Sequence, residues 1–137
     1  MEKKSDIIAI AKQFLERSYE KLTSAQILLE RDRIDDAISR AYYAAFLAAR
    51  GLLYLLGLTP KSHSGVLTMF GLKVIKEELL PPKTGKALNE LYGARENSDN
   101  GIIVYYNEED GRKYLDSARE IVESIKKLME TRFNIRF

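Results

Sequence analysis

Apolar side chains recur at helical spacing near the start of the chain. The recurring positions, separated alternately by three and four residues, are Ile8, Ala11, Leu15, Ser18, Leu22, Ala25 and Leu29. This spacing is typical of a helix that presents a narrow apolar seam to a neighbouring helix. We expect that helix to run from about Ser5 to Glu30.

A second helix is predicted from about Asp35 to Leu56, because carboxylates precede it as N-caps and Gly57 follows it as a C-cap glycine. The stretch from Ala41 to Leu58 is almost entirely apolar and approaches the length of a membrane span. Arg50 lies at its centre, however, where a charge is costly in a bilayer. We therefore expect the buried central member of a bundle and no membrane span.

The remaining apolar positions predict three more helices. The chain restarts at Thr59-Pro60, and a third helix is expected to continue to about Glu77, before Pro81-Pro82 forbids its continuation. A shorter fourth helix is expected from a cap at Thr84 through Arg95.

Residues 96–106 are interpreted as a polar connection with a small apolar insert at 102–104. Asn107, followed by an acidic turn, is expected to cap a fifth helix that ends near Thr131. The predicted fold is therefore all-α, an up-and-down bundle of about five helices in which residues 35–56 are central.

Composition narrows the classes of protein that this bundle can represent. Its 137 residues, 45% hydrophobic and 31% charged, are typical of one soluble domain spanning 1–137. The net charge of +2 argues against an obligate nonspecific DNA coater but permits a local basic patch. The chain has no cysteine and one histidine, so we expect no metal site and no cofactor. No targeting signal is apparent, which favours a cytoplasmic location.

A polar and aromatic stripe interrupts the apolar second helix. Its members, again at three- and four-residue spacing, are Arg40, Tyr43, Leu47, Arg50 and Tyr54. Guanidinium groups bind phosphate and tyrosines stack or donate hydrogen bonds, so the stripe predicts a phosphate-binding or subunit-facing surface. The alternative is that Arg40 pairs with Asp36 one turn earlier and the arginines extend into solvent.

Two further candidates lie at helix ends. His63 begins the third helix, where it could serve as a general base or a phosphate ligand, or simply belong to a capping loop. Arg95, with Asp99 and Asn100, could bind a phosphodiester; alternatively, Arg95 complements the negative end of its helix while the following residues turn the chain.

Three blocks of sequence carry a resemblance to a known family. They are D-D-A-I-S-R-A-Y-Y-A-A-F at 35–46, K-S-H-S-G-V at 61–66 and R-E-N-S-D at 95–99. Together they resemble the bacterial and archaeal HEPN-domain proteins of the UPF0332 group, over about residues 10–130. The resemblance implies a helical bundle that forms a homodimer and acts beside a minimal nucleotidyltransferase in a toxin-antitoxin-like pair. Many relatives in the wider superfamily are metal-independent ribonucleases, with an arginine followed after four to six residues by a histidine at the dimer cleft.

In this chain the motif arginine corresponds to Arg95, and the histidine position is occupied by Asn100. An asparagine cannot take a proton from a ribose hydroxyl at neutral pH. The leading hypothesis is therefore a homodimeric HEPN module, inactive or weakly active, that binds nucleotide or RNA and acts with a nucleotidyltransferase partner. Its ligand-binding residues would be Arg95, Asp99, Asn100, Arg40, Tyr43 and His63. One alternative is a ribonuclease that uses Arg95 with His63 or a tyrosine as proton acceptor, and another is a purely structural dimer.

Overall fold

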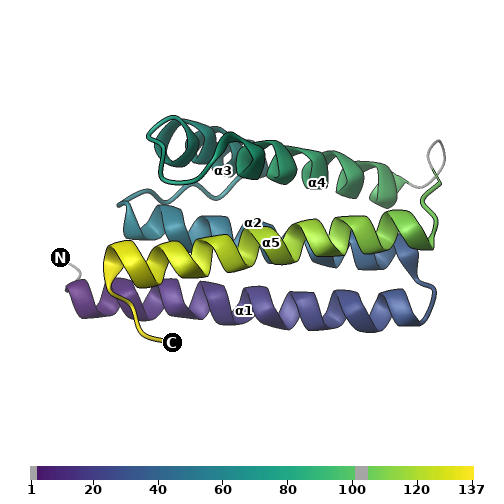
Figure 1. Ribbon diagram of the computed structural model, residues 1–137, viewed down its shortest axis with the longest axis horizontal. Helices are drawn as coiled ribbons and strands as arrows, with labels where there is room; N and C mark the ends of the chain where they lie inside the picture. Colours follow the sequence, from purple (N-terminus) through teal and green to yellow (C-terminus); the bar gives the residue numbers. More distant parts are fainter. Residues whose placement is uncertain (1–2, 101–104) are drawn as a thin grey trace.

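The chain forms an antiparallel helical bundle in the computed structural model, which describes residues 3–100 and 105–137. Every element within those residues is helical: α1 (Lys4–Glu30), α2 (Ile34–Leu55), α3 (His63–Phe70), the π-helical segment η1 (Gly71–Ile75), α4 (Pro82–Asn100) and α5 (Glu108–Phe133). The long helices alternate in direction along the chain, as Figure 1 shows. The predicted all-α, up-and-down fold is confirmed.

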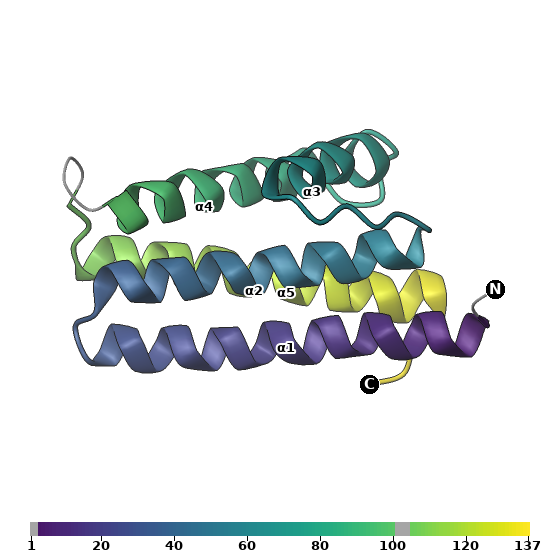
Figure 2. The same ribbon diagram turned by 180° about the vertical axis from the view of Figure 1, so that it is seen from behind.

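The α2 helix is the centre of this bundle, as its composition predicts. In Figure 1 it lies behind α5, and in the reverse view of Figure 2 it lies in front of α5, with α1 and α4 on either side. Its buried residues are Ala37, Ile38, Ala41, Tyr42, Ala44, Ala45, Phe46, Ala48, Ala49, Gly51, Leu52 and Leu53. Among the described residues, no helix combines the length and the apolarity needed to cross a membrane.

Small residues allow α1 and α2 to approach closely. A Cβ atom added to Gly51 would lie 2.9 Å from Cβ of Phe14 and 3.3 Å from the backbone oxygen of Ala11. Nearer the other end of α2, the buried Ser18 hydroxyl donates a 2.6 Å hydrogen bond to the backbone oxygen of Ala44. This bond satisfies the one polar member of the predicted α1 seam, which is otherwise apolar and buried or partly buried.

The predicted helix ends at Gly57 and Asn107 are confirmed. Gly57 adopts a positive φ of 81°, and the Leu58 N–H donates to the Leu53 carbonyl at 2.9 Å, as in a Schellman cap. At the start of α5, the Asn107 side chain accepts from the Asp110 N–H at 2.8 Å. The Asp110 carboxylate in return accepts from the Asn107 N–H at 2.9 Å, which completes a capping box.

The third predicted helix differs from the observed one. Instead of one helix to about Glu77, α3 begins at His63, after the Ser62 cap, and its hydrogen bonding changes to π type over Gly71–Ile75. The apolar spacing does not reveal the change to π hydrogen bonding, because Phe70 and Val74, four residues apart, are both buried across it.

The fourth predicted helix is too short at both ends. Thr84 is not a cap but a buried residue inside the first turn of α4, which begins at Pro82. Proline is compatible with a first helical position because its missing N–H would have no intrahelical partner there. At the other end α4 continues to Asn100, so the expected polar connection begins too early; the apolar insert expected at 102–104 lies outside the described residues.

Candidate functional site

A pocket of about 430 Å³ opens where α2 and α4 meet the end of α1. Its lining residues are Leu28, Asp36, Ser39, Arg40, Tyr43, Arg95 and Asp99. Four of the six candidate ligand-binding residues, two from α2 and two from α4, are therefore brought together although they lie more than fifty positions apart in the sequence. His63 and Asn100 do not line this pocket.

Arg95 is held in place from several directions, with 18% of its side chain exposed. Its Nε lies 2.8 Å from the Asp99 carboxylate and its Nη1 lies 3.3 Å from the Glu96 carboxylate. Its Nη2 donates a 3.0 Å hydrogen bond to the Tyr43 hydroxyl. The guanidinium also lies 5.3 Å from the centroid of the Tyr43 ring and 5.9 Å from that of Tyr42, at cation–π distances. These contacts fix the plane of the guanidinium.

Arg40 differs from Arg95 because no carboxylate of the described residues lies within ion-pair distance of it. It is exposed and, within residues 3–100 and 105–137, it takes part in none of the ion pairs. The expected pairing with Asp36 is therefore not observed, although both residues line the pocket. An unpaired guanidinium retains all of its donors for an incoming anion.

His63 lies near Arg95, within a cluster of aromatic rings. Its Nδ1 is 2.8 Å from the Tyr42 hydroxyl, and its ring centroid is 4.7 Å from that of Phe46. Burial and the positive charge of Arg95 lower the pKa of His63 below its ordinary value, against a smaller opposing effect of Glu96. The imidazole is therefore neutral at pH 7.

The tyrosines around His63 are held in their protonated form. Burial raises the pKa of Tyr42, which is completely inaccessible to solvent, and the nearby charge of Arg95 offsets only part of that effect. A hydrogen bond to Glu96, followed by burial, raises the pKa of Tyr92. Neither phenol is suited to accept a proton at neutral pH.

The HEPN domain family matches residues 11–128 of the chain. The chain belongs to that family. It is 33% identical over 114 residues to a UPF0332 protein of Thermotoga maritima, which covers 83% of this chain and 86% of the relative. It is 34% identical over 125 residues, 91% of this chain and 92% of the relative, to a Methanocaldococcus jannaschii protein named "Putative toxin". The resemblance to the UPF0332 group is confirmed.

A solved structure supports the same fold. The crystal structure of a Thermus thermophilus protein superposes with a TM-score of 0.74, at 21% identity, over 86% of this HEPN chain and 97% of that one. At this level of identity the likeness concerns the fold alone.

Asn100, at the position where the HEPN resemblance expects a histidine, lies outside the pocket. Arg95 and Asp99 are one turn apart on α4 and face the pocket together. Five residues of α-helix rotate a side chain by about 140° from its starting direction, so Asn100 is exposed at the helix end and turned away from that lining. Across the residues that the structure describes, no group of His, Asp and Glu side chains could hold a metal ion.

The stripe predicted on α2 is divided between two surroundings. Arg40 and Tyr43 reach the pocket, whereas the Arg50 guanidinium stacks 5.0 Å from the centroid of the Phe14 ring on α1. The Tyr54 ring also faces Phe14, at 6.3 Å. The second half of the stripe is thus partly covered within the same chain, because Phe14 of α1 packs against it.

Sequence reasoning missed three residues of the HEPN site: Tyr42, Tyr92 and Glu96. Tyr42 is buried against His63, the Tyr92 ring lies 5.6 Å from the Tyr42 ring and is tilted by 56° to it, and Glu96 pairs with Arg95. Only Tyr42 had a local signal, as the buried neighbour of Tyr43 in a tyrosine pair. Glu96 becomes recognisable once α4 is known to continue beyond Arg95, and Tyr92 once α4 is known to pack against Tyr42.

Proposed function

We propose that this HEPN chain is a nucleotide- or RNA-binding module, and that the pocket between α2 and α4 receives one nucleotide of single-stranded RNA. The observation that carries the proposal is the uncompensated Arg40 guanidinium beside the Tyr43 ring. A guanidinium binds a phosphate through two parallel hydrogen bonds, and an unpaired base stacks on a tyrosine face. A pocket of about 430 Å³ falls within the usual size range of small-ligand sites.

Arg95 has a different role in this proposal. Asp99 and Glu96 already compensate its charge and fix its plane, so it orients the Tyr43 hydroxyl and restricts the pocket wall. A phosphate that contacts Arg95 directly competes with two carboxylates that are almost half exposed, which makes Arg40 the stronger anchor.

The proposed cellular role and partners of this chain are inferred from its family. The "Putative toxin" relatives support the proposal that this chain is the toxin-like member of a toxin-antitoxin-like pair in the cytoplasm. In that proposal it forms a homodimer and acts with a minimal nucleotidyltransferase, as the HEPN resemblance implies. Binding rather than cleavage is favoured because Asn100 replaces the expected histidine and is directed away from the pocket.

Fluorescence anisotropy with a labelled single-stranded RNA tests the binding proposal. Arg40→Ala is expected to weaken binding by roughly tenfold and to lower the salt slope by about one, because one phosphate contact is lost. The control is Arg132→Ala, which removes an exposed arginine from the last turn of α5, outside the pocket. It makes the same change in net charge and is expected to leave the affinity for RNA unchanged. Equal weakening by both variants, or no RNA binding at low salt, would contradict the pocket assignment.

A ribonuclease is the second candidate, supported by one observation. The neutral imidazole of His63 interacts with the charge of Arg95 and contacts Tyr42, over whose ring Arg95 lies. A neutral histidine can accept a proton while an arginine stabilises the transition state. Incubation of the same RNA with the protein in EDTA, followed by a denaturing gel, shows whether the RNA is cleaved. Cleavage lost in both Arg95→Ala and His63→Ala would establish the enzyme, and RNA left both unbound and uncut would favour the structural dimer.

A further inference from the structure

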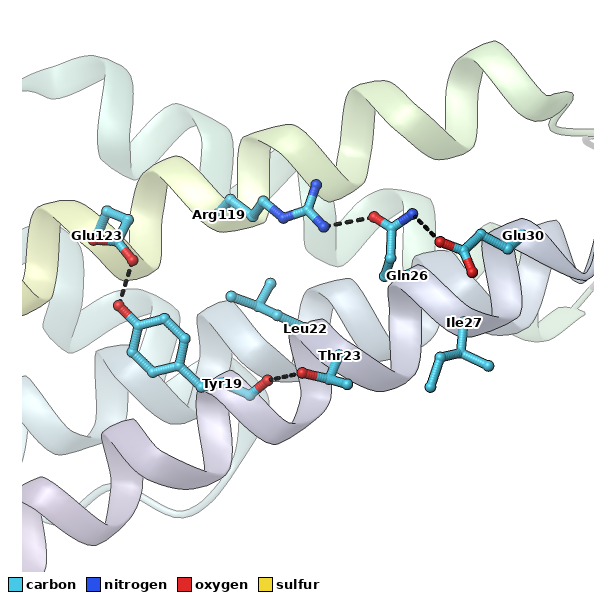
Figure 3. Close-up of a pocket in the computed structure, with 8 residues that line it drawn as sticks. All are labelled: Tyr19, Leu22, Thr23, Gln26, Ile27, Glu30, Arg119 and Glu123. Atoms are coloured by element: carbon cyan, nitrogen blue, oxygen red, sulfur yellow. Dashed lines mark hydrogen bonds between the residues drawn. The ribbon is translucent and has the colours of Figure 1, made fainter.

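A second depression runs between α1 and α5, with a volume of about 380 Å³. Its lining residues, drawn in Figure 3, are Tyr19, Leu22, Thr23, Gln26, Ile27, Glu30, Arg119 and Glu123. We call it the α1–α5 groove. It shares no residue with the pocket between α2 and α4, which lies on the side of α1 that faces those two helices. The groove therefore offers a surface that the proposed RNA site does not use.

Long polar side chains bridge the two helices across this groove (Figure 3). The Tyr19 hydroxyl donates a hydrogen bond to the Glu123 carboxylate. Further along, Arg119 donates to the Gln26 side-chain oxygen at 2.6 Å, and the Gln26 amide donates to Glu30 at 2.9 Å. These bonds fix the two carboxylates at defined places along the groove.

Both carboxylates lack a cationic partner. Arg119 is paired with Asp116 at 3.5 Å, outside the groove. Glu30 and Glu123 accept hydrogen bonds from neutral groups, and within the described part of the chain neither takes part in an ion pair. The groove thus carries two carboxylates without an ion-pair partner, one near each end, and one guanidinium, that of Arg119, whose ion pair is with Asp116.

The electrostatic environment at the Tyr19 end agrees with this charge count. Burial raises the pKa of Tyr19, and the hydrogen bond to Glu123 and the charges of Glu123 and Glu130 raise it further. The Lys126 ammonium lies over the Tyr19 ring, 5.7 Å from its centroid, and forms no ion pair with Glu123. The Glu123 carboxylate at this end is therefore left without an ion pair, although a lysine lies nearby.

Apolar surface lies between the two charged ends. Leu22 forms the floor, and Ile27 is 51% exposed although it belongs to a long, well-packed helix. Tyr19 and Glu30 are eleven residues apart, which is about 16 Å and close to three full turns of α-helix. Since Glu123 contacts Tyr19, the two carboxylates lie about three helical turns apart, with the apolar Leu22 and Ile27 between them beside the bridging Arg119–Gln26 pair.

We propose that the α1–α5 groove docks a basic amphipathic helix of a partner protein. Two lysine or arginine side chains, eleven residues apart on that helix, meet Glu123 and Glu30. Apolar side chains at the two turns between them cover Leu22 and Ile27. Charge complementarity selects this occupant, because helix-in-groove recognition uses anchors at such helical spacing and charged ends set the register.

A second copy of this chain does not provide that pattern. Only Arg50 and Lys61 are basic residues separated by eleven positions. They do not lie on one helix, because α2 ends at Leu55 and Lys61 precedes α3. The occupant is therefore a different protein. Its docking leaves the pocket between α2 and α4 open on the other side of α1.

Calorimetry with the full chain and two designed helical peptides tests the proposal. The first peptide has lysines at positions i and i+11 and leucines at i+4 and i+7, and the second has glutamates in place of the lysines. The lysine peptide is expected to bind and the glutamate peptide is not. The double variant Glu30→Gln/Glu123→Gln is expected to weaken binding of the lysine peptide by roughly tenfold, the combined effect of two exposed ion pairs.

The matched control is Glu77→Gln/Glu90→Gln, which removes the same charge from the α3–α4 side. It is expected to leave the affinity unchanged, and circular dichroism checks that all variants are equally helical. No heat with the lysine peptide, equal binding of both peptides, or equal loss in both double variants would overturn the proposal. So would a wild-type dimer in light scattering that Ile27→Ser converts to a monomer, because the groove would then belong to a second copy. RNA binding measured on the Glu30→Gln/Glu123→Gln variant is expected to match wild type, which separates this inference from the proposed function.

Discussion

The hydrogen bond between Tyr42 and His63 is expected to stabilise the packing of α3 onto α2, and a double-mutant cycle can measure it. The Tyr42 hydroxyl is completely buried and lies 2.8 Å from His63 Nδ1. Tyr42→Phe and His63→Phe each keep a ring in the aromatic cluster while removing one partner of the bond. Comparing both single variants with the double variant isolates the interaction from the loss of ring packing.

The expected magnitudes follow from burial. Tyr42→Phe removes one hydrogen bond and is expected to cost about 1 kcal/mol. His63→Phe leaves the buried Tyr42 hydroxyl without its partner, which costs about 1–3 kcal/mol. In the double variant neither group remains unpaired, so its loss is expected to be smaller than the sum of the singles by about 1 kcal/mol. For a chain of this size that difference corresponds to about 4 °C in Tm.

Urea unfolding followed by circular dichroism supplies the four free energies of unfolding. Tyr92→Phe combined with His63→Phe serves as the control cycle, because Tyr92 belongs to the same cluster but its hydroxyl is bonded to Glu96. We expect that control to be additive within about 0.3 kcal/mol. Additive losses in the Tyr42 cycle, or the same coupling energy in both cycles, would refute the reasoning.

Three further predictions concern stability. Because burial and Arg95 lower the pKa of His63, the protein is expected to keep its full stability above about pH 6.5 and to lose part of it as pH falls through the lowered folded-state pKa. Urea titrations between neutral and mildly acidic pH should show a shallower loss in His63→Phe, and parallel profiles would contradict the assignment. Gly51→Ala is expected to lower Tm because the added Cβ meets Phe14. Gly93→Ala, in open space on α4, is expected to raise the free energy of unfolding by about 0.5–1 kcal/mol. Equal shifts in Tm for the two variants would refute the close α1–α2 approach. Asn107→Ala removes one side of the capping box and is expected to cost about 1 kcal/mol in thermal unfolding, and an unchanged Tm would count against that cap.

The sequence is sufficient to predict the long helices, for a physical reason. In α1 and α5 each turn places an apolar residue against the core, and caps such as Asn107 or Gly57 mark the ends through local backbone geometry. The polar residues at the end of α4 predict a loop, and this prediction is wrong because the helix continues to Asn100. Ser98 in fact continues the buried face of α4, and the ion pair from Arg95 to Asp99 forms along the helix. Polar composition alone does not distinguish a loop from the solvent side of a helix.

The candidate site could be predicted only in part, because its members depend on tertiary packing. The resemblance identified Arg95, and the stripe identified Arg40 and Tyr43, but spacing along one helix does not reveal which other helix faces it. The contact between Tyr42 and His63 depends on how α3 folds back over α2 after a turn of irregular chain. No local pattern encodes that placement.

The block S-R-A-Y-Y-A-A-F lies on α2, where its successive residues contact different elements of the bundle. Successive residues of a helix point about 100° apart, so neighbouring positions serve different partners. Arg40 and Tyr43 line the pocket with α4, Tyr42 bonds to the start of α3, and Ala44 accepts the hydrogen bond from α1. A substitution at any of these positions changes a different interface. The same central helix thus contributes Arg40 and Tyr43 to the pocket on one side of the bundle, whereas the α1–α5 groove is built without α2.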